Sequence, residues 1–312
     1  MKRLLRFLPL PAQLQARCSP VLTYHACFAQ RPRNVAEADN ISPNRMFDQV
    51  SWLKRRYRFV TIDEFCQAKH RRGMAAVTFD DGYKSAVNDA LPVLQSLDVP
   101  CTIFVNTFAL EKKTFWRHKV VYIMQNGLVE DCARSFLRTR TLTDGFYRDL
   151  KHPTNNSKVV EEEVDAFLAS GGLEVDDCDH LMDDRSWFRR HPLVWYGNHS
   201  HNHYVLSSLS RQEQAEEIGK TKAVIASIPG IQTSEVFSLP FGEAHHLNED
   251  TLAAIKECGY RALLMNQGGV NGRRLARRCG LPVVERFSPY EGPIDMQLKK
   301  EICRSLARRL WI

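Results

Sequence analysis

The stretch Ala75-Ala76-Val77-Thr78-Phe79-Asp80-Asp81-Gly82 decides the fold of this chain. Its first five residues are apolar or β-branched, which predicts a buried strand. Beyond it, apolar residues at 86, 87, 90, 91, 94 and 97 share one face of a helix. Two carboxylates therefore stand where a strand ends, at the edge that carries the chemistry of α/β proteins. Taken alone, Asp80 and Asp81 are more commonly a turn and a helix cap.

Strand and helix patterns alternate on both sides of this stretch. Upstream, an apolar strand pattern at 21–24 ends in His25, and a second short strand pattern covers 57–61. Further strands are predicted at 101–105, 193–197, 236–239, 260–265 and 281–284, and helices at 43–53, 210–228 and 252–258. This βα alternation predicts a parallel sheet or barrel.

Residues 111 to about 190 interrupt that rhythm. They show helical patterns at 115–124, 131–137 and 159–168, separated by polar loops. We interpret them as a helical insertion on one loop of the barrel, and we hypothesise that it is a lid over a substrate cleft. The expected domain covers 20–295, between a basic N-terminal segment, 1–19, and a basic amphipathic helix, 296–312.

The composition indicates an ordinary globular protein of a reducing compartment. The 312 residues are 44% hydrophobic and 25% charged, enough to bury a core without disulfides. Nine cysteines without a Cys-x-x-Cys pair favour free thiols. The chain begins with a basic, apolar segment that Arg6 and Pro9 interrupt, and no stretch reaches the ~18 apolar residues of a spanning helix. We therefore expect a cytoplasmic protein.

The net charge of +7 gathers in three clusters, at 2–6, 273–278 and 299–309. The last cluster lies on the C-terminal amphipathic pattern, which could rest on an anionic membrane face and place the protein peripherally at the inner membrane. A solvated surface helix is the simpler interpretation. No nucleic-acid-binding motif accompanies the charge, so we expect no nucleic-acid partner. The sequence does not determine the oligomeric state.

Three of the eleven histidines, His199, His201 and His203, follow the strand predicted at 193–197. A single histidine is commonly structural, but three in five positions favour a metal or catalytic site. On a helical turn, residues 199 and 203 would face the same way. Two neutral imidazoles and a carboxylate, from Asp81 or Asp80, make a three-ligand site that leaves one position for water.

Together these residues carry a resemblance. Thr78 to Gly82, then His199-Ser200-x-x-His203, then Phe237-Ser238-Leu239-Pro240-Phe241-Gly242, resemble the ordered motifs of the polysaccharide deacetylase family. This is carbohydrate esterase family 4, the NodB-homology domain. The resemblance covers about residues 20 to 290 without the helical insertion. It implies a distorted (β/α) barrel of about seven strands that removes acetyl groups, mostly N-acetyl, from glycans.

The resemblance also implies roles for individual residues. Asp81, His199 and His203 would bind a divalent metal, in this family usually Zn²⁺, and Asp80 would be the base that deprotonates the metal-bound water. The backbone N–H of Phe241 would help to hold the oxyanion. His201 matches a variable position, which indicates a supporting or surface residue. Residues expected to contact substrate or to support the ligands are Tyr83, Ser200, Pro240, Gly242 and His245.

Two departures from the family pattern affect these roles. Many members have an arginine in the third motif that contacts the catalytic aspartate, where this chain has Ser238. Many also have a C-terminal Leu-x-x-His that supplies the general acid, but no histidine follows His246. Leu22-Thr23-Tyr24-His25 resembles that missing segment, as in the circularly permuted exopolysaccharide deacetylases. His25 is therefore the predicted acid, with His245 and His246 as alternatives.

These observations predict a metal-dependent hydrolase that removes the N-acetyl group from an acetamido sugar of a bacterial surface glycan, or of its lipid-linked or nucleotide-linked precursor. One alternative is an O-deacetylase or a deformylase on a related glycan. Another is a barrel that binds glycan without catalysis, which Ser238 in place of an arginine would favour. A basic nucleic-acid-binding protein would bind with an affinity that falls steeply with salt.

Overall fold

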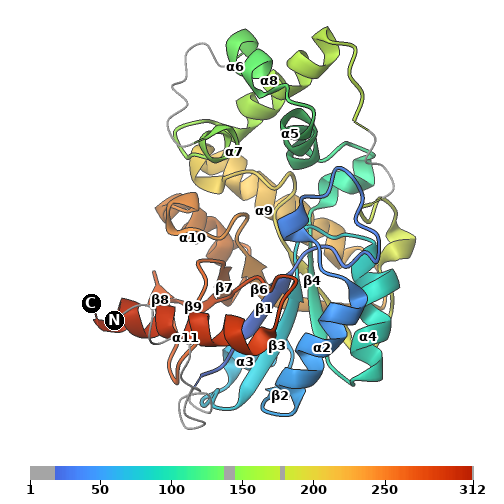
Figure 1. Ribbon diagram of the computed structural model, residues 1–312. Coiled ribbons are helices and arrows are strands. Elements are labelled where there is room, and N and C mark those ends of the chain that lie inside the picture. Colours follow the sequence, from blue (N-terminus) through green and yellow to red (C-terminus); the bar gives the residue numbers. More distant parts are fainter. Residues whose placement is uncertain (1–17, 137–144, 176–179, 311–312) are drawn as a thin grey trace.

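A computed structural model describes residues 18–136, 145–175 and 180–310 (Figure 1). Most of the basic N-terminal segment, the Trp311-Ile312 end of the C-terminal pattern and Cys178 lie outside the described residues.

The core of the molecule is a curved sheet whose seven parallel strands, in the described part of the chain, have the order β1-β3-β4-β5-β6-β7-β9. Two short strands extend it: β2 pairs with β3, and β8 forms an antiparallel pair with β9. The fold is therefore the predicted α/β class. The strands are β1 Val21–Tyr24, β2 Arg58–Phe59, β3 Met74–Phe79, β4 Cys101–Val105, β5 Val194–Asn198, β6 Gln232–Ser238, β7 Ala262–Met265, β8 Ala276–Arg278 and β9 Leu281–Glu285.

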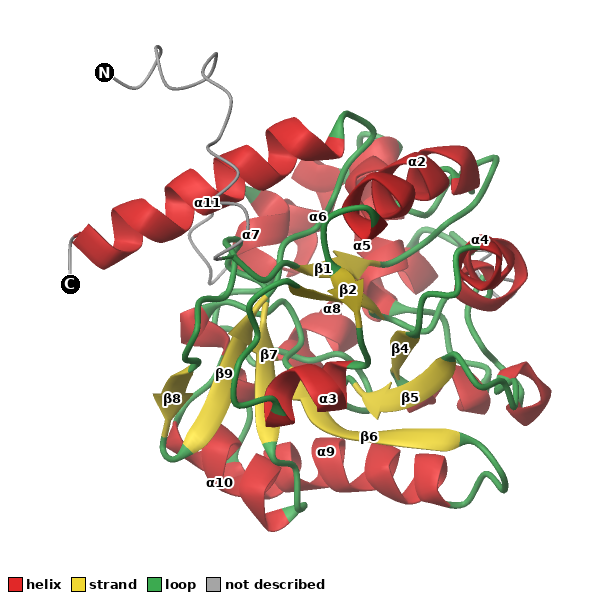
Figure 2. Cartoon of the chain, turned by 90° about the horizontal axis from the view of Figure 1, so that it is seen from below, coloured by secondary structure: helices red, strands yellow, loops and turns green. Residues whose placement is uncertain are grey.

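The two ends of the sheet meet just beyond β9. Phe287 donates its backbone N–H to the Val21 carbonyl, and Thr23 donates its N–H to the Phe287 carbonyl. These bonds join β1 to the segment that follows β9, so the sheet curls round on itself as a distorted barrel (Figure 2). The N-terminal strand thus occupies the place between β3 and the end of β9.

Alternate residues of the strands point into the barrel and fill it. One buried apolar cluster joins strand residues Val21, Ala76, Phe104, Val236, Leu264 and Val284 to Ile62 and Phe65 of α3 (Ile62–Gln67). Figures 1 and 2 place α3 across the end of the barrel opposite to the helical insertion. The Phe104 ring packs so closely on Gly197 that a Cβ at 197 would collide with it. Because the interior and one end are filled, the open end lies at the carboxyl ends of the strands.

Helices surround the sheet and form the insertion. Those around the barrel are α2 Pro43–Lys54, α4 Leu91–Ser96, α9 Arg211–Ala226, α10 Glu249–Glu257 and α11 Ile294–Leu310, and a turn of π-helix, Ala86–Ala90, precedes α4. Between β4 and β5 stand α5 Trp116–Gln125, α6 Val129–Phe136, α7 Phe146–Leu150 and α8 Ser157–Ser170. In Figure 1 these four helices lie together beyond the carboxyl ends of the strands.

Most predicted elements match the structure to within a few residues, and the exceptions have local causes. The strand expected at 57–61 is only the two residues of β2, and β8 was not predicted because Ala276-Arg277-Arg278 is polar and exposed. β8 is a strand because it forms an antiparallel ladder with β9. No helix in the described ranges is both long and apolar enough to cross a bilayer. All eight described cysteines are free thiols.

Candidate metal centre

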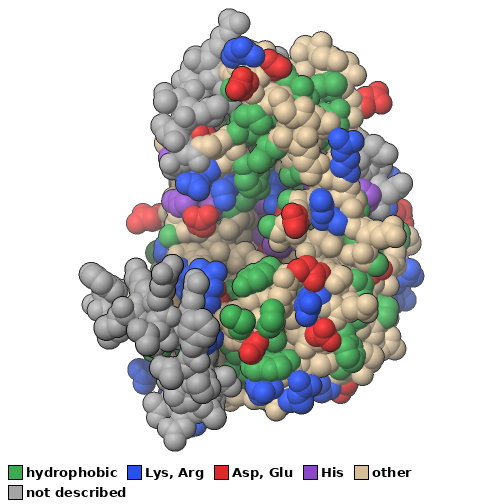
Figure 3. Space-filling view, viewed as in Figure 1, with side chains coloured by type: hydrophobic (Ala, Val, Ile, Leu, Met, Phe, Trp, Pro, Cys, Tyr) green, Lys and Arg blue, Asp and Glu red, His purple; other side chains and the backbone are tan. Residues whose placement is uncertain are grey.

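The ends of β3 and β5 bring two motifs into contact. Asp80 and Asp81 directly follow β3, and His199 directly follows β5. Because parallel strands end at the same edge, these side chains converge there, with His203 beside them. All four are at least 98% buried. Figure 3 shows a recess between the insertion and the barrel, with histidine side chains in and beside it.

Three acceptor atoms face one another at the centre of this group. Asp81 Oδ1 lies 3.6 Å from His199 Nε2 and 3.3 Å from His203 Nε2. Burial lowers the pKa of both histidines, so both imidazoles are neutral near pH 7. Asp81 Oδ1 has no hydrogen-bond partner among the described residues. A buried carboxylate oxygen without a donor, facing two imidazole nitrogens, fits a divalent metal with Asp81, His199 and His203 as ligands.

A different kind of contact orients each of the two histidines, His199 and His203. His199 Nδ1–H donates to the Ser238 carbonyl at 2.9 Å, which leaves the Nε2 lone pair able to bind a metal. His203 has no such bond at Nδ1 within the described residues. Its ring instead packs edge-on against Phe241, with centroids 4.6 Å apart, and Phe115, at 5.5 Å. The strand end thus orients one ligand, and aromatic packing orients the other.

The two histidines do not lie on a helical turn, and that expectation was wrong. Residues 199–205 form an irregular loop in which Ser200 and His203 have positive φ angles of 63° and 58°. The His203 N–H donates to Ser200 Oγ at 3.1 Å, so Ser200 supports the ligand loop. Asp81 and Phe241 are also left-handed, at 70° and 60°. Strained backbone of this kind concentrates at functional sites.

Asp80 is paired with an arginine that the sequence analysis did not find. Arg286 Nη1 donates to Asp80 Oδ1 at 2.9 Å, and Nη2 donates to Oδ2 at 2.7 Å. Ser238 Oγ lies 3.2 Å from Oδ1 and accepts from Arg286 Nη2 at 2.9 Å. Ser238 thus stands where many family members have an arginine, and Arg286, the residue directly after β9, makes the contact with Asp80 here. Burial would raise the pKa of Asp80, but Arg286 lowers it to about 2, so the carboxylate stays ionised.

Asp81 is paired with a second arginine, Arg117 of α5. Arg117 Nη1 donates to Asp81 Oδ2 at 2.8 Å, and Nη2 donates to Asp39 Oδ2 at 2.9 Å. Its Nε donates to the Tyr147 hydroxyl at 2.8 Å. The helical insertion therefore contributes directly to the centre. No sequence signal marked this residue, because Arg117 lies within an ordinary helical pattern.

The third motif forms a tight turn beside the ligands. Gly242 N–H donates to the Pro240 carbonyl at 2.7 Å, which places Phe241 at the apex of a γ-turn. Gly242 has φ 70°, and a Cβ there would collide with the backbone of Asn266. The turn brings the Phe241 ring against His203.

The candidate acids have different surroundings. His25 follows β1, and the β1–β3 register places it opposite Asp80 at the open edge. His246 is fully buried, and burial lowers its pKa to about 3. The half-exposed His245 lies with His152 and His246, its ring centroid 6.3 Å and 4.1 Å from theirs.

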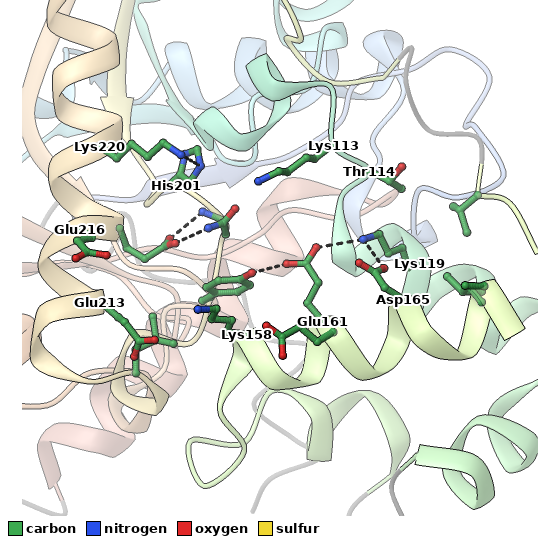
Figure 4. A pocket seen from close by; sticks show the side chains of 18 of the residues that line it. Lys113, Thr114, Lys119, Lys158, Glu161, Asp165, His201, Glu213, Glu216 and Lys220 are labelled. Carbon is green, nitrogen blue, oxygen red and sulfur yellow. Dashed lines mark hydrogen bonds and ion pairs between the residues drawn. The ribbon is translucent and has the colours of Figure 1, made fainter.

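Two other predicted residues have hydrogen-bond partners other than Asp81, His199 and His203. The buried Tyr83 hydroxyl is 2.7 Å from His118 Nε2 of α5, so it joins the barrel to the insertion. His201 is buried, with Nδ1 2.8 Å from Thr107 Oγ1 and Nε2 2.7 Å from Lys220 Nζ. It lines a cavity of about 770 Å³ behind the ligand loop, between α8 and α9 (Figure 4). His201 is thus a buried supporting residue.

This geometry agrees with the comparison to known proteins. The sequence profile of the family described as polysaccharide deacetylase matches residues 67–144 and 188–263, which contain the ends of β3 and β5. The chain belongs to the polysaccharide deacetylase family. Members are deacetylases, so this protein is a hydrolase that removes acetyl groups. None of the curated proteins matches the chain.

Solved structures share the fold of this deacetylase. The deacetylase PplD of Streptococcus pyogenes, in complex with acetate, is 17% identical with a TM-score of 0.54, over 91% of this chain and 98% of that one. IcaB of Ammonifex degensii is 18% identical with a TM-score of 0.51, over 92% and 97%. A polysaccharide deacetylase of Bacillus cereus is 17% identical with a TM-score of 0.53, over 91% and 69%. At these identities the likeness concerns the fold.

Proposed function

We propose that this protein is a metal-dependent N-deacetylase of an acetamido sugar in a bacterial surface glycan or its precursor. The observation that carries the proposal is the convergence of Asp81 Oδ1 and the Nε2 atoms of His199 and His203, next to an ionised Asp80. Asp81, His199 and His203 would hold the metal, most readily Zn²⁺ given this ligand set. When bound, the metal would polarise the acetyl carbonyl and acidify water.

The residues around the metal ligands would perform the other steps. Asp80, fixed through both oxygens by Arg286, would accept the proton of the attacking water. A carboxylate whose pKa is near 2 is a weak base, so it suits a water that is already acidified. The backbone N–H of Phe241, at the apex of its turn, would help to hold the oxyanion.

His25 would protonate the leaving amine. Its position opposite Asp80 at the open edge supports this role, whereas burial holds the His246 pKa near 3 and keeps that imidazole neutral. His25→Ala should leave metal content unchanged and slow hydrolysis of an N-acetyl sugar more than that of an activated acetate ester, whose leaving group needs no proton. Equal losses on both substrates would assign His25 a structural role and make His245 the next residue to test.

The main proposal is tested by acetate release. Purified protein, loaded with Zn²⁺ and checked by elemental analysis, would be incubated with N-acetyl amino-sugar oligomers and with O-acetylated sugars. We expect the protein to release acetate from the N-acetyl substrates. A chelator should abolish this release, and added Zn²⁺ should restore it. Release from O-acetylated sugars alone would favour an O-deacetylase, and formate from an N-formyl sugar would favour a deformylase. Stoichiometric metal with no release from any of them would favour a non-catalytic glycan-binding barrel.

The substrate would be a lipid-linked or nucleotide-linked intermediate of glycan synthesis. The protein would act in the cytoplasm and contact the inner membrane peripherally. Support comes from the basic residues of α11 and of the β8 region, among them Arg273, Arg277, Lys299 and Lys300. If the protein contacts the membrane, it should sediment with anionic vesicles, and salt should release it. Deletion of 299–312 should weaken this binding. No binding at low ionic strength would favour a nucleotide-linked substrate.

A further inference from the structure

Arg117 joins three separate segments at the metal centre. It lies at the start of α5, in the insertion, and its guanidinium bonds Asp81 after β3, Asp39 before α2, and Tyr147 of α7. Its side chain is only 12% exposed, and that of Asp81 is fully buried. A guanidinium so placed cannot move without breaking contacts to all three.

The consequence for Asp81 is that its two oxygens differ. Oδ2 is occupied by Arg117 Nη1 at 2.8 Å. Oδ1 has no donor among the described residues and faces the two imidazole nitrogens. A carboxylate can bind a metal through one or both oxygens, and here only one is available.

This difference matters because the coordination position left open is the one that water needs. Catalytic zinc sites keep three protein ligands and one exchangeable position. If Asp81 could rotate and chelate with both oxygens, the second oxygen would fill or crowd that position.

The charge balance of the centre also favours a reactive water at that position. Asp39, Asp80 and Asp81 face Arg117 and Arg286, so these five groups carry −1 without a divalent metal and +1 with it, which favours hydroxide and an oxyanion.

We propose that Arg117 is a positioning residue that makes Asp81 a one-oxygen metal ligand, so that the helical insertion keeps the water position open. The inference rests on the proposed metal site. It assigns the insertion a role in the reaction besides that of covering the barrel.

The test uses Co²⁺ in place of Zn²⁺, because the visible absorption of Co²⁺ weakens as its coordination number rises. Arg117→Met should still bind one Co²⁺ but show a severalfold loss of molar absorptivity, because Asp81 would then bind the Co²⁺ through both oxygens. Turnover of an activated acetate ester should fall about 10- to 100-fold, the usual effect of removing a hydrogen bond to a metal ligand. The KM should change much less, because the loss is at the water position.

Two matched controls separate positioning from packing. Asp39→Asn weakens the other ion pair of Arg117 without touching Asp81, and should keep the wild-type spectrum. Lys158→Gln removes a positive charge elsewhere on the insertion, at the exposed start of α8, and should also keep it. If Arg117→Met does not fold, Arg117→Gln replaces it, because glutamine is too short to reach Asp81.

An unchanged Co²⁺ spectrum in the folded Arg117 variant would overturn the proposal, as would the same spectral loss in Lys158→Gln, which would mean that the spectrum responds to any loss of positive charge on the insertion. Wild-type protein that takes up no Co²⁺ would instead overturn the metal site itself, and the role of Arg117 with it. The spectrum and the metal content therefore tell the two failures apart.

Discussion

The two aspartates of the centre are neighbours in sequence, yet each is paired by a different region of the molecule. The barrel pairs Asp80 with Arg286, whose side chain is fully buried. The insertion pairs Asp81 with Arg117, whose side chain is 12% exposed and whose guanidinium is shared with Asp39. The first pair lies within a packed sheet. The second lies where two parts of the chain meet, so its geometry depends on how the insertion is seated.

This difference separates two tasks. Asp80 has to stay ionised. Its buried ion pair with Arg286, made through two hydrogen bonds, keeps it ionised regardless of the position of the insertion. Asp81 has to present one oxygen, and a contact from a separate segment can hold or release it. Variants on the barrel side should therefore change chemistry and stability together, whereas variants on the insertion side should change the metal geometry with little effect on the barrel.

The largest effect is expected where the two regions share ligands. His199→Ala or His203→Ala leaves two of the three ligand atoms, so neither variant should retain stoichiometric metal after dialysis. Activity should fall by more than about 10³-fold, because the metal contributes several kcal/mol to the transition state. Metal analysis and circular dichroism check this. Full metal in the double variant would show that the ligands lie elsewhere.

Asp80→Asn tests the barrel side alone. Asparagine keeps the shape but cannot accept a proton, so turnover should drop about 10²–10⁴-fold with metal retained. Asp81→Asn should weaken metal binding instead. Metal loss in Asp80→Asn together with metal retention in Asp81→Asn would mean that base and ligand are assigned the wrong way round.

Arg286→Met tests whether the buried pair also stabilises the barrel. Near pH 7, removal of Arg286 leaves Asp80 charged and buried without its cation, which should cost about 3–5 kcal/mol of unfolding free energy. The pH dependence has a definite sign. Because Arg286 holds the folded pKa of Asp80 near 2, below the unfolded value of about 3.9, the pair stabilises above pH 4 and loses that effect as the pH falls towards 2.

Urea unfolding of metal-free protein at a series of pH values measures both quantities. The difference between wild type and Arg286→Met should be largest near neutrality and should shrink between about pH 4 and pH 2. A difference that stays constant across this range would show that Arg286 stabilises by packing and not through the charge of Asp80.

The same comparison explains how much of the centre the sequence could predict. Asp80, Asp81 and His199 each follow an apolar run, so strand periodicity alone places them at one edge. Arg286 follows the strand pattern at 281–284 in the same way, but a lone arginine 206 residues from its partner carries no motif. Only the meeting of β1 with the segment after β9 brings the two together, and that is a property of the closed sheet.

Other features were beyond the sequence for different reasons. The convergence of His199 and His203 depends on left-handed backbone at Ser200 and His203, a conformation that only a few per cent of non-glycine residues adopt. Arg117 reaches Asp81 only because the insertion folds back over the strand ends. Such contacts between an insertion and its host barrel leave no periodic signal in either segment.

The smallest effect should come from the outermost contact of the insertion. Tyr147→Phe removes the hydroxyl that accepts from Arg117 Nε at 2.8 Å, but it leaves both carboxylate contacts of the guanidinium in place. Hydrogen bonds to charged groups contribute about 1.5–3 kcal/mol to stability, so the loss should appear mainly in the free energy of unfolding. Because Asp81 Oδ2 stays occupied, the Co²⁺ spectrum should match wild type, and turnover should fall by less than about tenfold, which is less than about 1.4 kcal/mol in the activation free energy. A spectral loss as large as that of Arg117→Met would mean that Tyr147 holds the guanidinium in place, and that the insertion side of the centre is set by α7 as much as by the carboxylates.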